Sequence, residues 1–202
     1  MKKRNWGVVL LVAMALSACT TGGKSSYVPQ RSGIYVKNDK SIESAIVEPV
    51  EDGKYTSEGL KKFAEHEVER YNTEKNTNNV KVVSAQVKDG NASVIFSYTD
   101  ANTFLDFAKF SQDNTVKVES IQVMSLEEAK SQGQLDGIDT SQINSSANVV
   151  AIKGIADVTT QGSILAAVSD GKQLNHEEKE VVTEGEMSYI CLLYTSPSPR
   201  DS

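Results

Sequence analysis

Several residue types are scarce in this chain of 202 residues, and each scarcity excludes a class of protein. With 2 Cys the chain cannot be a disulfide-rich scaffold, and with 13 Gly and 4 Pro it is neither collagen-like nor a Pro/Gly-rich disordered sequence. It has no apolar run of the roughly 20 residues that a membrane-spanning helix needs. What remains, 39% hydrophobic and 24% charged residues, is typical of a globular protein with one domain and short appendages.

Positive charge and catalytic motifs are also lacking. The formal net charge is -6, which argues against nucleic-acid binding because that binding depends on Lys and Arg at the phosphates. The chain contains no Gly-x-Ser-x-Gly nucleophile motif, no phosphate-binding P-loop and no dinucleotide-binding glycine fingerprint. We therefore expect a protein that is not an enzyme and that uses no cofactor.

The N-terminus has the three parts of a secretory signal peptide. Residues 2–4 are basic, residues 8–16 form a short uncharged apolar run, and small residues follow. The junction resembles the lipobox of bacterial lipoproteins and consists of Leu16, Ser17, Ala18 and Cys19. The resemblance implies that residues 1–18 are the signal peptide, that a diacylglyceryl group is attached to the Cys19 thiol, and that cleavage occurs just before Cys19. An ordinary secretory peptide that happens to contain a Cys is the alternative.

Lipid on Cys19 would decide where the protein works. Each buried CH₂ contributes roughly 0.8 kcal/mol, so two or three acyl chains hold a protein stably on a membrane whereas one binds only marginally. We expect residues 19–33 to be the lipidated Cys and a flexible tether, since residues 20–26 are rich in Gly, Ser and Thr. The expected location is the extracytoplasmic face of the cell membrane. The membrane is the predicted partner, nucleic acid is not, and a protein or envelope-polymer partner stays open.

The C-terminus is a second segment to set apart from the fold. Residues 191–202 resemble the in-frame translation of a sequencing adapter, and the Ser-Pro-Ser-Pro run at residues 196–199 cannot continue the strand predicted before it. We therefore expect the natural domain to be truncated near Ile190, with Cys191 and Leu192 able to complete a strand by chance. A genuine C-terminal tail is the alternative.

Three helices are predicted in the domain from their capping residues and apolar spacing. The first follows Thr56, an N-cap residue, and Tyr55 before it is placed to pack on Leu60. The second follows Asp100, and the third opens with a capping box that begins at Ser125. The apolar stripe of the first helix recurs at three- and four-residue steps and consists of Leu60, Phe63, Ala64, Val68 and Tyr71.

Short β-rich runs separate these helices, and turn residues lie between several of them. Hairpin turns are predicted at residues 38–39, 89–90 and 170–171, where Asn-Asp or Asp-Gly lies between β-rich runs. Hairpins joined by helices give antiparallel sheets, so we expect one α+β domain over residues 34–190, with two or three helices packed on one face of an antiparallel sheet. The expected strands are residues 34–36, 42–47, 80–87, 92–98, 116–123, 149–152, 164–168, 181–182 and 189–190.

Two groups of residues could hold a metal ion, and for each the plainer interpretation is favoured. His66 and His176 could join carboxylates around zinc, but Arg70 stands where a zinc-binding helix would place its second His, so both histidines are expected in solvent. Residues 136–139, with Gln134, offer oxygen ligands for calcium but lack the spacing and the closing Glu of an EF-hand. We assign no metal ligand.

Two further groups are also expected to be structural. The acidic run at residues 177–180 is expected to be a solvated surface. Phe104, Phe107 and Phe110 are expected to lie in the core and not to form a ligand platform. The residues with an expected function are therefore Cys19, for lipidation, and the lipobox around it.

The mature region resembles small uncharacterised lipoproteins of Gram-positive bacteria. The resemblance is carried by the opening strand at residues 34–36, by the helix start at residues 55–60 and by the hairpin at residues 87–90. It supports the location and the fold, and it implies no site residue.

Three functions remain open. The first is a membrane-anchored extracytoplasmic domain that binds a partner or serves an envelope role without catalysis. The second is a carboxylate-dependent hydrolase of envelope glycan or peptidoglycan, which requires two acids about 5–9.5 Å apart in a cleft. The third is the substrate-binding lipoprotein of a transporter, although such proteins usually close two lobes around a ligand and this domain offers one core.

Overall fold

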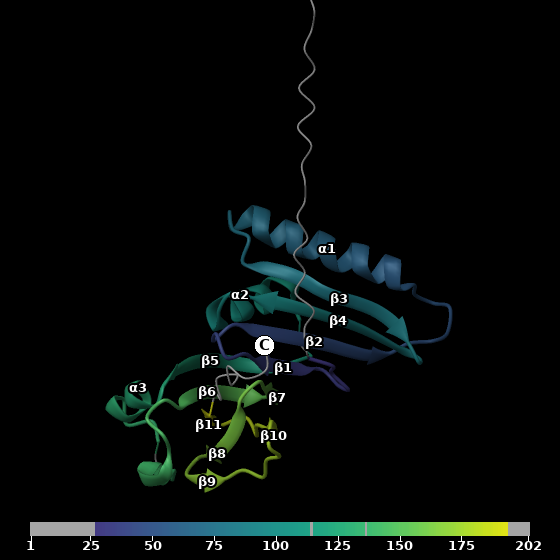
Figure 1. The fold of residues 1–202 in the computed structure, drawn as a ribbon. Coiled ribbons are helices and arrows are strands. Elements are labelled where there is room, and N and C mark those ends of the chain that lie inside the picture. The colour runs from purple at the N-terminus through teal and green to yellow at the C-terminus, as the bar shows by residue number, and fades with distance from the viewer. Residues whose placement is uncertain (1–26, 114, 136, 194–202) are drawn as a thin grey trace, which may run out of the picture.

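The computed structural model describes residues 27–113, 115–135 and 137–193, which form two β-sheets and three α-helices (Figure 1). The α+β class is therefore confirmed. The predicted signal peptide, the lipobox with Cys19 and residues 194–202 lie outside the described residues. None of the described helices is long and apolar enough to cross a bilayer.

The larger sheet, called sheet A, has six strands in the order β10-β7-β1-β2-β4-β3. Neighbouring strands run antiparallel except β1 and β7, which pair in parallel. Its strands are β1 (Gly33–Val36), β2 (Ile42–Pro49), β3 (Val80–Lys88), β4 (Asn91–Tyr98), β7 (Asp157–Thr160) and β10 (Glu180–Val182).

The smaller sheet, sheet B, is wholly antiparallel and has the order β5-β6-β11-β8-β9. One sheet was expected, but the strands form two, because β7 pairs with β1 and β10 pairs with β7. Both strands therefore belong to sheet A, although the strands next to them in the chain belong to sheet B. Neither β7 nor β9 was predicted from the sequence. The strands of sheet B are β5 (Lys117–Ser125), β6 (Asn148–Ile155), β8 (Ser163–Ser169), β9 (Lys172–Gln173) and β11 (Met187–Leu193).

The three helices begin where the capping residues predict. Thr56 Oγ1 accepts from the Gly59 amide at the start of α1 (Ser57–Glu74), and Asp100 accepts from the Thr103 amide at the start of α2 (Ala101–Ser111). The capping box that opens α3 (Leu126–Ser131) is formed in full. These side chains satisfy backbone amides that have no partner within a helix.

One member of the predicted stripe on α1 does not belong to the core. Ala64, Val68 and Tyr71 are buried, but the Phe63 side chain is 67% exposed. Tyr55, expected to pack on the first turn, is 50% exposed. Spacing therefore predicts the direction of the buried face correctly and overestimates its width.

The edge of sheet A at β3 is covered by α1. The Ser57 hydroxyl accepts from the Val87 amide at 2.9 Å, and the Asn72 side-chain amide donates to the Val80 carbonyl at 2.9 Å. The helix thus binds free backbone groups at both ends of the strand. Covering an edge in this way prevents it from pairing with a strand of another molecule.

The predicted Asp-Gly hairpin turns are present. Asp89 and Gly90 have φ of 51° and 74°, and Asp170 and Gly171 have φ of 48° and 71°. Positive φ at both central residues is the geometry of the tight hairpin turn whose twist matches that of the strands.

Side chains of sheet A alternate between two faces. The inner face, which carries Ile34, Val36 and Ile42, packs against α1, α2 and sheet B in the main core. On the opposite side of sheet B, α3 covers a second apolar cluster that includes Cys191. Strand β11 continues past Ile190, and Cys191 and Leu192 are fully buried in it. The outer face of sheet A carries no helix in the described part of the chain and is where the candidate site lies.

Candidate functional site

Polar side chains line up across the outer face of sheet A. Pairing places Thr159 of β7 beside Tyr35 of β1, and Tyr35 beside Glu43 of β2. Side chains alternate along each strand, so directly paired residues share one face. The full row, from one edge of the sheet to the other, is Glu180, Thr159, Tyr35, Glu43, Ser97 and Lys81.

The chain leading into β1 crosses this face, and we call residues 27–32 the strap. Its Tyr27 ring stacks on Tyr35 with 5.0 Å between ring centroids and 12° between planes. The Ser32 hydroxyl accepts from the Val47 amide at 2.9 Å and donates to the Val47 carbonyl at 3.1 Å. Tyr27 is buried, so the strap is part of the folded domain although the tether was expected to extend to residue 33.

Burial makes Tyr27 a neutral hydrogen-bonding group. Loss of solvent, with the negative charges of Asp157, Glu180 and Glu43 nearby, raises its pKa to about 12. The side chain of Thr159 in β7 interacts with the Tyr27 hydroxyl and offsets part of this rise in pKa. The interaction links the strap to β7.

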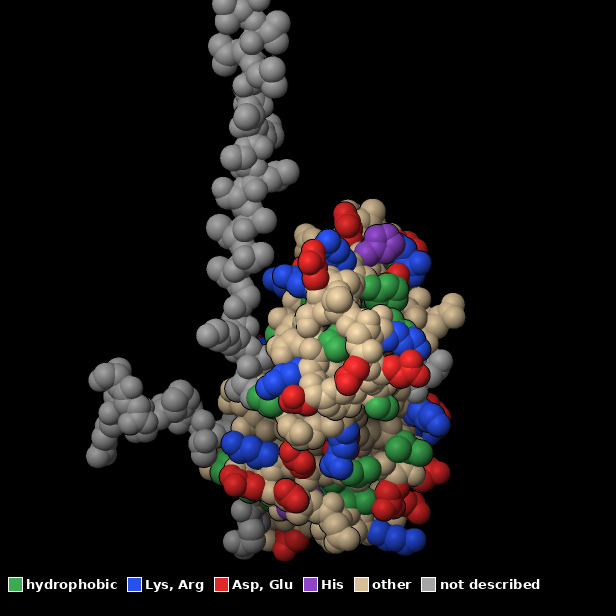
Figure 2. All heavy atoms as spheres, turned by 90° about the vertical axis from the view of Figure 1, so that its right-hand side faces the viewer, with side chains coloured by type: hydrophobic (Ala, Val, Ile, Leu, Met, Phe, Trp, Pro, Cys, Tyr) green, Lys and Arg blue, Asp and Glu red, His purple; other side chains and the backbone are tan. Residues whose placement is uncertain are grey.

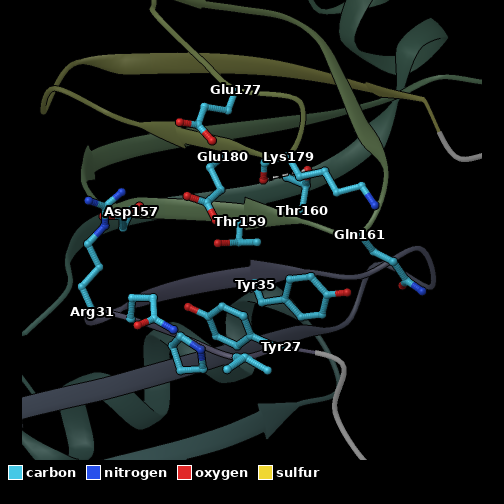
Figure 3. A pocket seen from close by; sticks show the side chains of 13 residues that line it. Tyr27, Arg31, Tyr35, Asp157, Thr159, Thr160, Gln161, Glu177, Lys179 and Glu180 are labelled. Atoms are coloured by element: carbon cyan, nitrogen blue, oxygen red, sulfur yellow. Dashed lines mark hydrogen bonds and ion pairs between the residues drawn. The ribbon is translucent and has the colours of Figure 1, made fainter. Parts of the chain in front are cut away.

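A cavity of about 700 Å³ lies on the outer face between the strap, β1, β7 and the segment that leads into β10 (Figure 3). At one end Arg31 of the strap forms an ion pair with Asp157 at the start of β7. A Cβ at Gly33 would lie 2.6 Å from the Asp157 carbonyl oxygen, so only glycine lets β1 approach β7 this closely. The cavity is lined by Tyr27, Val28, Pro29, Gln30, Arg31, Tyr35, Asp157, Thr159, Thr160, Gln161, Glu177, Lys179 and Glu180.

Two carboxylates of the lining are available to a ligand. Asp157 is paired with Arg31, whereas Glu177 and Glu180 form no ion pair within the described residues. Both lie on the same side of the cavity as Asp157, with Lys179 and Gln161 at the other end in Figure 3. The site therefore has an acidic end and an opposite end with an ammonium group and an amide.

A second cavity, of about 580 Å³, lies on the other side of the strap. It shares Tyr27 to Gln30 with the first and extends over β4 and β3, where its lining is mostly polar and includes Ser84, Gln86 and Ser93. The strap thus divides a long polar surface into two adjoining compartments.

Cys191, the cysteine among the described residues, does not line this cavity. Cys191 is buried in the apolar cluster beside α3, and burial raises the pKa of its thiol to about 11. A thiol in that state is a poor nucleophile. Among the described residues, no three His, Cys, Asp or Glu side chains form a group that could hold a metal ion.

The two histidines lie on different elements. His66 is exposed on α1, next to the β3 edge of sheet A, and His176 precedes β10 at the other edge, where its Nδ1 lies 2.9 Å from the Glu177 carbonyl oxygen. Of the calcium alternative, Asp136 lies outside the described residues and Asp139 accepts from the Ser141 amide. Gln134 Oε1 is buried without a hydrogen-bond partner in the described part of the chain.

The three phenylalanines of α2 lie in the main core or pack against it, as the sequence predicts. Phe104 and Phe107 are buried in the main core, and Phe110 packs against it beneath the Arg70 guanidinium, 4.7 Å from the ring centroid. They form no platform for a ligand on the outer face.

This cavity is not predicted by the sequence. Residues 177–180 are exposed as expected, but Glu177 and Glu180 line the site. Strand β7, whose four residues alternate between partly buried and buried, was not predicted either. The β-branched residues Val158, Thr159 and Thr160 were the signal available in the sequence, but the parallel partner of β7 lies over 120 residues earlier in the chain.

Figure 2 shows another face, where acidic and basic side chains are interspersed and hydrophobic side chains form small separate patches. Comparison of the chain with protein-family models, curated proteins and solved structures finds no match.

Proposed function

We propose that this protein is a non-catalytic binding domain, held by lipid on Cys19 at the extracytoplasmic face of the membrane, that binds a hydroxyl-rich envelope glycan in the cavity beside the strap. The observation that carries the proposal is the cavity of about 700 Å³ on the outer face of sheet A, in which Glu177 and Glu180 form no ion pair with any described residue. Its volume falls in the range of roughly 300–1,000 Å³ that is typical of ligand sites.

The chemistry of the lining supports a ligand with many hydroxyl groups. Carboxylates accept hydrogen bonds, an ammonium group donates them, and the amide of Gln161 does both. The lining has three acidic and two basic side chains, so their charges nearly cancel. The cavity therefore favours a polar ligand over a highly charged polymer. A rigid framework supports binding as well, because the Tyr27–Tyr35 stack and the Arg31–Asp157 pair fix the walls beforehand.

The buried strap limits how far from the lipid the site can lie. Seven residues, 20–26, lie between Cys19 and Tyr27, which makes eight Cα–Cα steps. A fully extended chain spans roughly 3.5 Å per step, so the strap would lie within about 30 Å of the membrane surface. The proposed ligand is accordingly an envelope polymer close to the membrane.

Lipidation is tested by metabolic labelling with a palmitate analogue. We expect the full chain to incorporate the label and a Cys19→Ser variant to incorporate none. Equal labelling of both chains, or of neither, would contradict the proposed anchor.

Ligand binding is tested by co-sedimentation of the Cys19→Ser chain with purified insoluble peptidoglycan. We expect Glu180→Gln and Glu177→Gln to weaken binding about three- to tenfold, because each replaces a charged hydrogen-bond acceptor by a neutral one. Glu178→Gln is the matched control, since Glu178 lies between the two and does not line the cavity. Equal binding by all variants, or none by the parent chain, would refute the proposal.

A carboxylate-dependent glycan hydrolase is the second candidate, because Asp157, Glu177 and Glu180 share this cavity. Hydrolysis of glycosidic bonds needs two such acids on either side of the bond. Release of reducing sugar ends from peptidoglycan by the parent chain, abolished in Glu177→Gln or Glu180→Gln, would favour the hydrolase over the binding domain.

A further inference from the structure

A chemically different cavity lies on the inner side of sheet A. It has a volume of about 520 Å³ and is formed where α1 and α2 pass over β2 and β4. Its lining consists of Ile46, Glu48, Phe63, Ala64, Glu67, Phe96, Phe107, Ser111, Gln112, Asp113 and Thr115. It shares no residue with the cavity beside the strap.

The inner wall of this cavity is apolar. Ala64, Phe96 and Phe107 are buried members of the main core, and Ile46 packs against them. Phe63 also lines the cavity, yet it is 67% exposed and is the most exposed residue of the predicted α1 stripe. An aromatic side chain left in water at the rim of an apolar cavity is surface that a ligand can bury.

The charged side chains of the lining are all acidic. They are Glu48, Glu67 and Asp113, and no Lys, Arg or His is among the described residues that line the cavity. Glu67 is paired with Arg70 at 3.0 Å, and Asp113 accepts from the amide and hydroxyl of Thr115. Glu48 forms no ion pair within the described part of the chain, so its charge is left for a ligand.

We propose that the cavity between α1 and α2 binds the apolar group of a small cationic ligand, an aryl- or alkylammonium compound. The apolar body lies against Phe96, Phe107 and Phe63, and the ammonium group lies among the acidic side chains at the rim. An anionic amphiphile is rejected because its charge would face three carboxylates and no cation within the lining. The assignment is independent of the outer-face cavity.

The charge requirement is tested with three probes of one shape: 4-phenylbutylammonium, 4-phenylbutanol and 4-phenylbutanoate. Each is titrated calorimetrically into the mature chain carrying Cys19→Ser. We expect the ammonium compound to bind most tightly, the alcohol more weakly and the carboxylate weakest. A carboxylate that binds as tightly as the ammonium, or the absence of binding by all three at about 1 mM, would overturn the proposal.

Two variants assign the binding to this cavity. Glu48→Gln should weaken binding of the ammonium compound about two- to fivefold and leave binding of the alcohol unchanged, because an exposed charge contributes only a modest interaction. Glu65→Gln is the matched control, since Glu65 lies on α1 outside the lining. Phe63→Ala should weaken binding of the ammonium compound and of the alcohol equally, while the Tm stays near that of the parent. Equal effects of Glu48→Gln and Glu65→Gln would contradict the site.

Discussion

The two faces of sheet A differ in almost every physical respect although they are made by the same six strands. The inner face carries fully buried aliphatic side chains such as Ile34, Ile42 and Val158. The outer face carries a small apolar cluster around Tyr27 and Tyr35, and polar side chains around it. Burial on the inner face provides stability, and the outer face is free to carry polar groups.

This division follows from the two-residue period of a strand. Along β1, Ile34 faces the main core and Tyr35 the outer face, and a shift of one residue in pairing would exchange them. The difference in burial between the two faces is smaller at β1, because the strap buries the outer side of this strand as well. Substitutions on one face or the other test this difference in burial and stability.

The largest effect is expected on the inner side. Phe104→Ala removes a buried ring that packs edge-on against Tyr98, 5.3 Å between centroids, and leaves a cavity. It should lower the free energy of unfolding by about 3–5 kcal/mol in urea denaturation. Val182→Ala on the outer face is the control, and it should change the free energy by less than about 1 kcal/mol because Val182 is 48% exposed. Equal losses of unfolding free energy in the two variants would contradict this difference between the faces.

An intermediate effect is expected at the one polar pair that the inner face buries within the described strands. The hydroxyls of Ser44 and Tyr98 are joined by a hydrogen bond of 2.8 Å. Tyr98→Phe should lower the free energy of unfolding by about 1–3 kcal/mol, because it leaves the Ser44 hydroxyl buried without its partner.

The double variant Ser44→Ala/Tyr98→Phe sharpens this test. Removing both hydroxyls leaves no unpaired group, so the double variant should be more stable than Tyr98→Phe alone. Additive losses in a double-mutant cycle would mean that the two hydroxyls do not interact.

The smallest effect is expected on the outer face and only at high pH. The folded protein holds the pKa of Tyr27 at about 12, above its usual value of 10, so ionisation opposes folding. The stability that the neutral ring contributes is complete below pH 10 and is lost as the pH rises from 10 to 12. Tyr27→Phe should therefore lose less stability than the parent over this interval.

Comparing Tyr27→Phe with the parent isolates the effect of ionising Tyr27 on stability. Tyr71, on the inner side, has its pKa raised to about 12 by burial and by Asp106, and it titrates in both proteins. Parallel stability curves for the two proteins between pH 10 and 12 would show that Tyr27 does not hold the strap in the way the structure indicates.

Local signals in the sequence predicted most secondary structure because their causes are local. Thr56, Asp100 and Ser125 cap helices through hydrogen bonds to residues three positions on, and Asp89-Gly90 reverses the chain within two residues. Side-chain chemistry and backbone preference act over these distances, so no knowledge of the rest of the chain was needed.

The candidate site could not be predicted because its residues come from distant segments. Arg31 forms an ion pair with Asp157, and Thr159 lies beside Tyr35, because β1 and β7 pair in parallel. No hairpin turn in the sequence indicates that pairing. Phe63 matched the spacing of the buried stripe, but spacing does not specify how wide a surface the sheet can cover. Both outcomes depend on how whole elements pack.

By itself the sequence determined an α+β domain, its helix starts and its hairpin turns, and the lipid anchor at Cys19 stays a prediction. Only the tertiary structure decided that the strands divide into two sheets, that the strap crosses the uncovered face, and that Glu177 and Glu180 border a cavity with Tyr27. The physical reason is distance along the chain: caps and turns involve neighbours, whereas a cavity exists only after segments far apart have been fixed against each other by the burial of a common core.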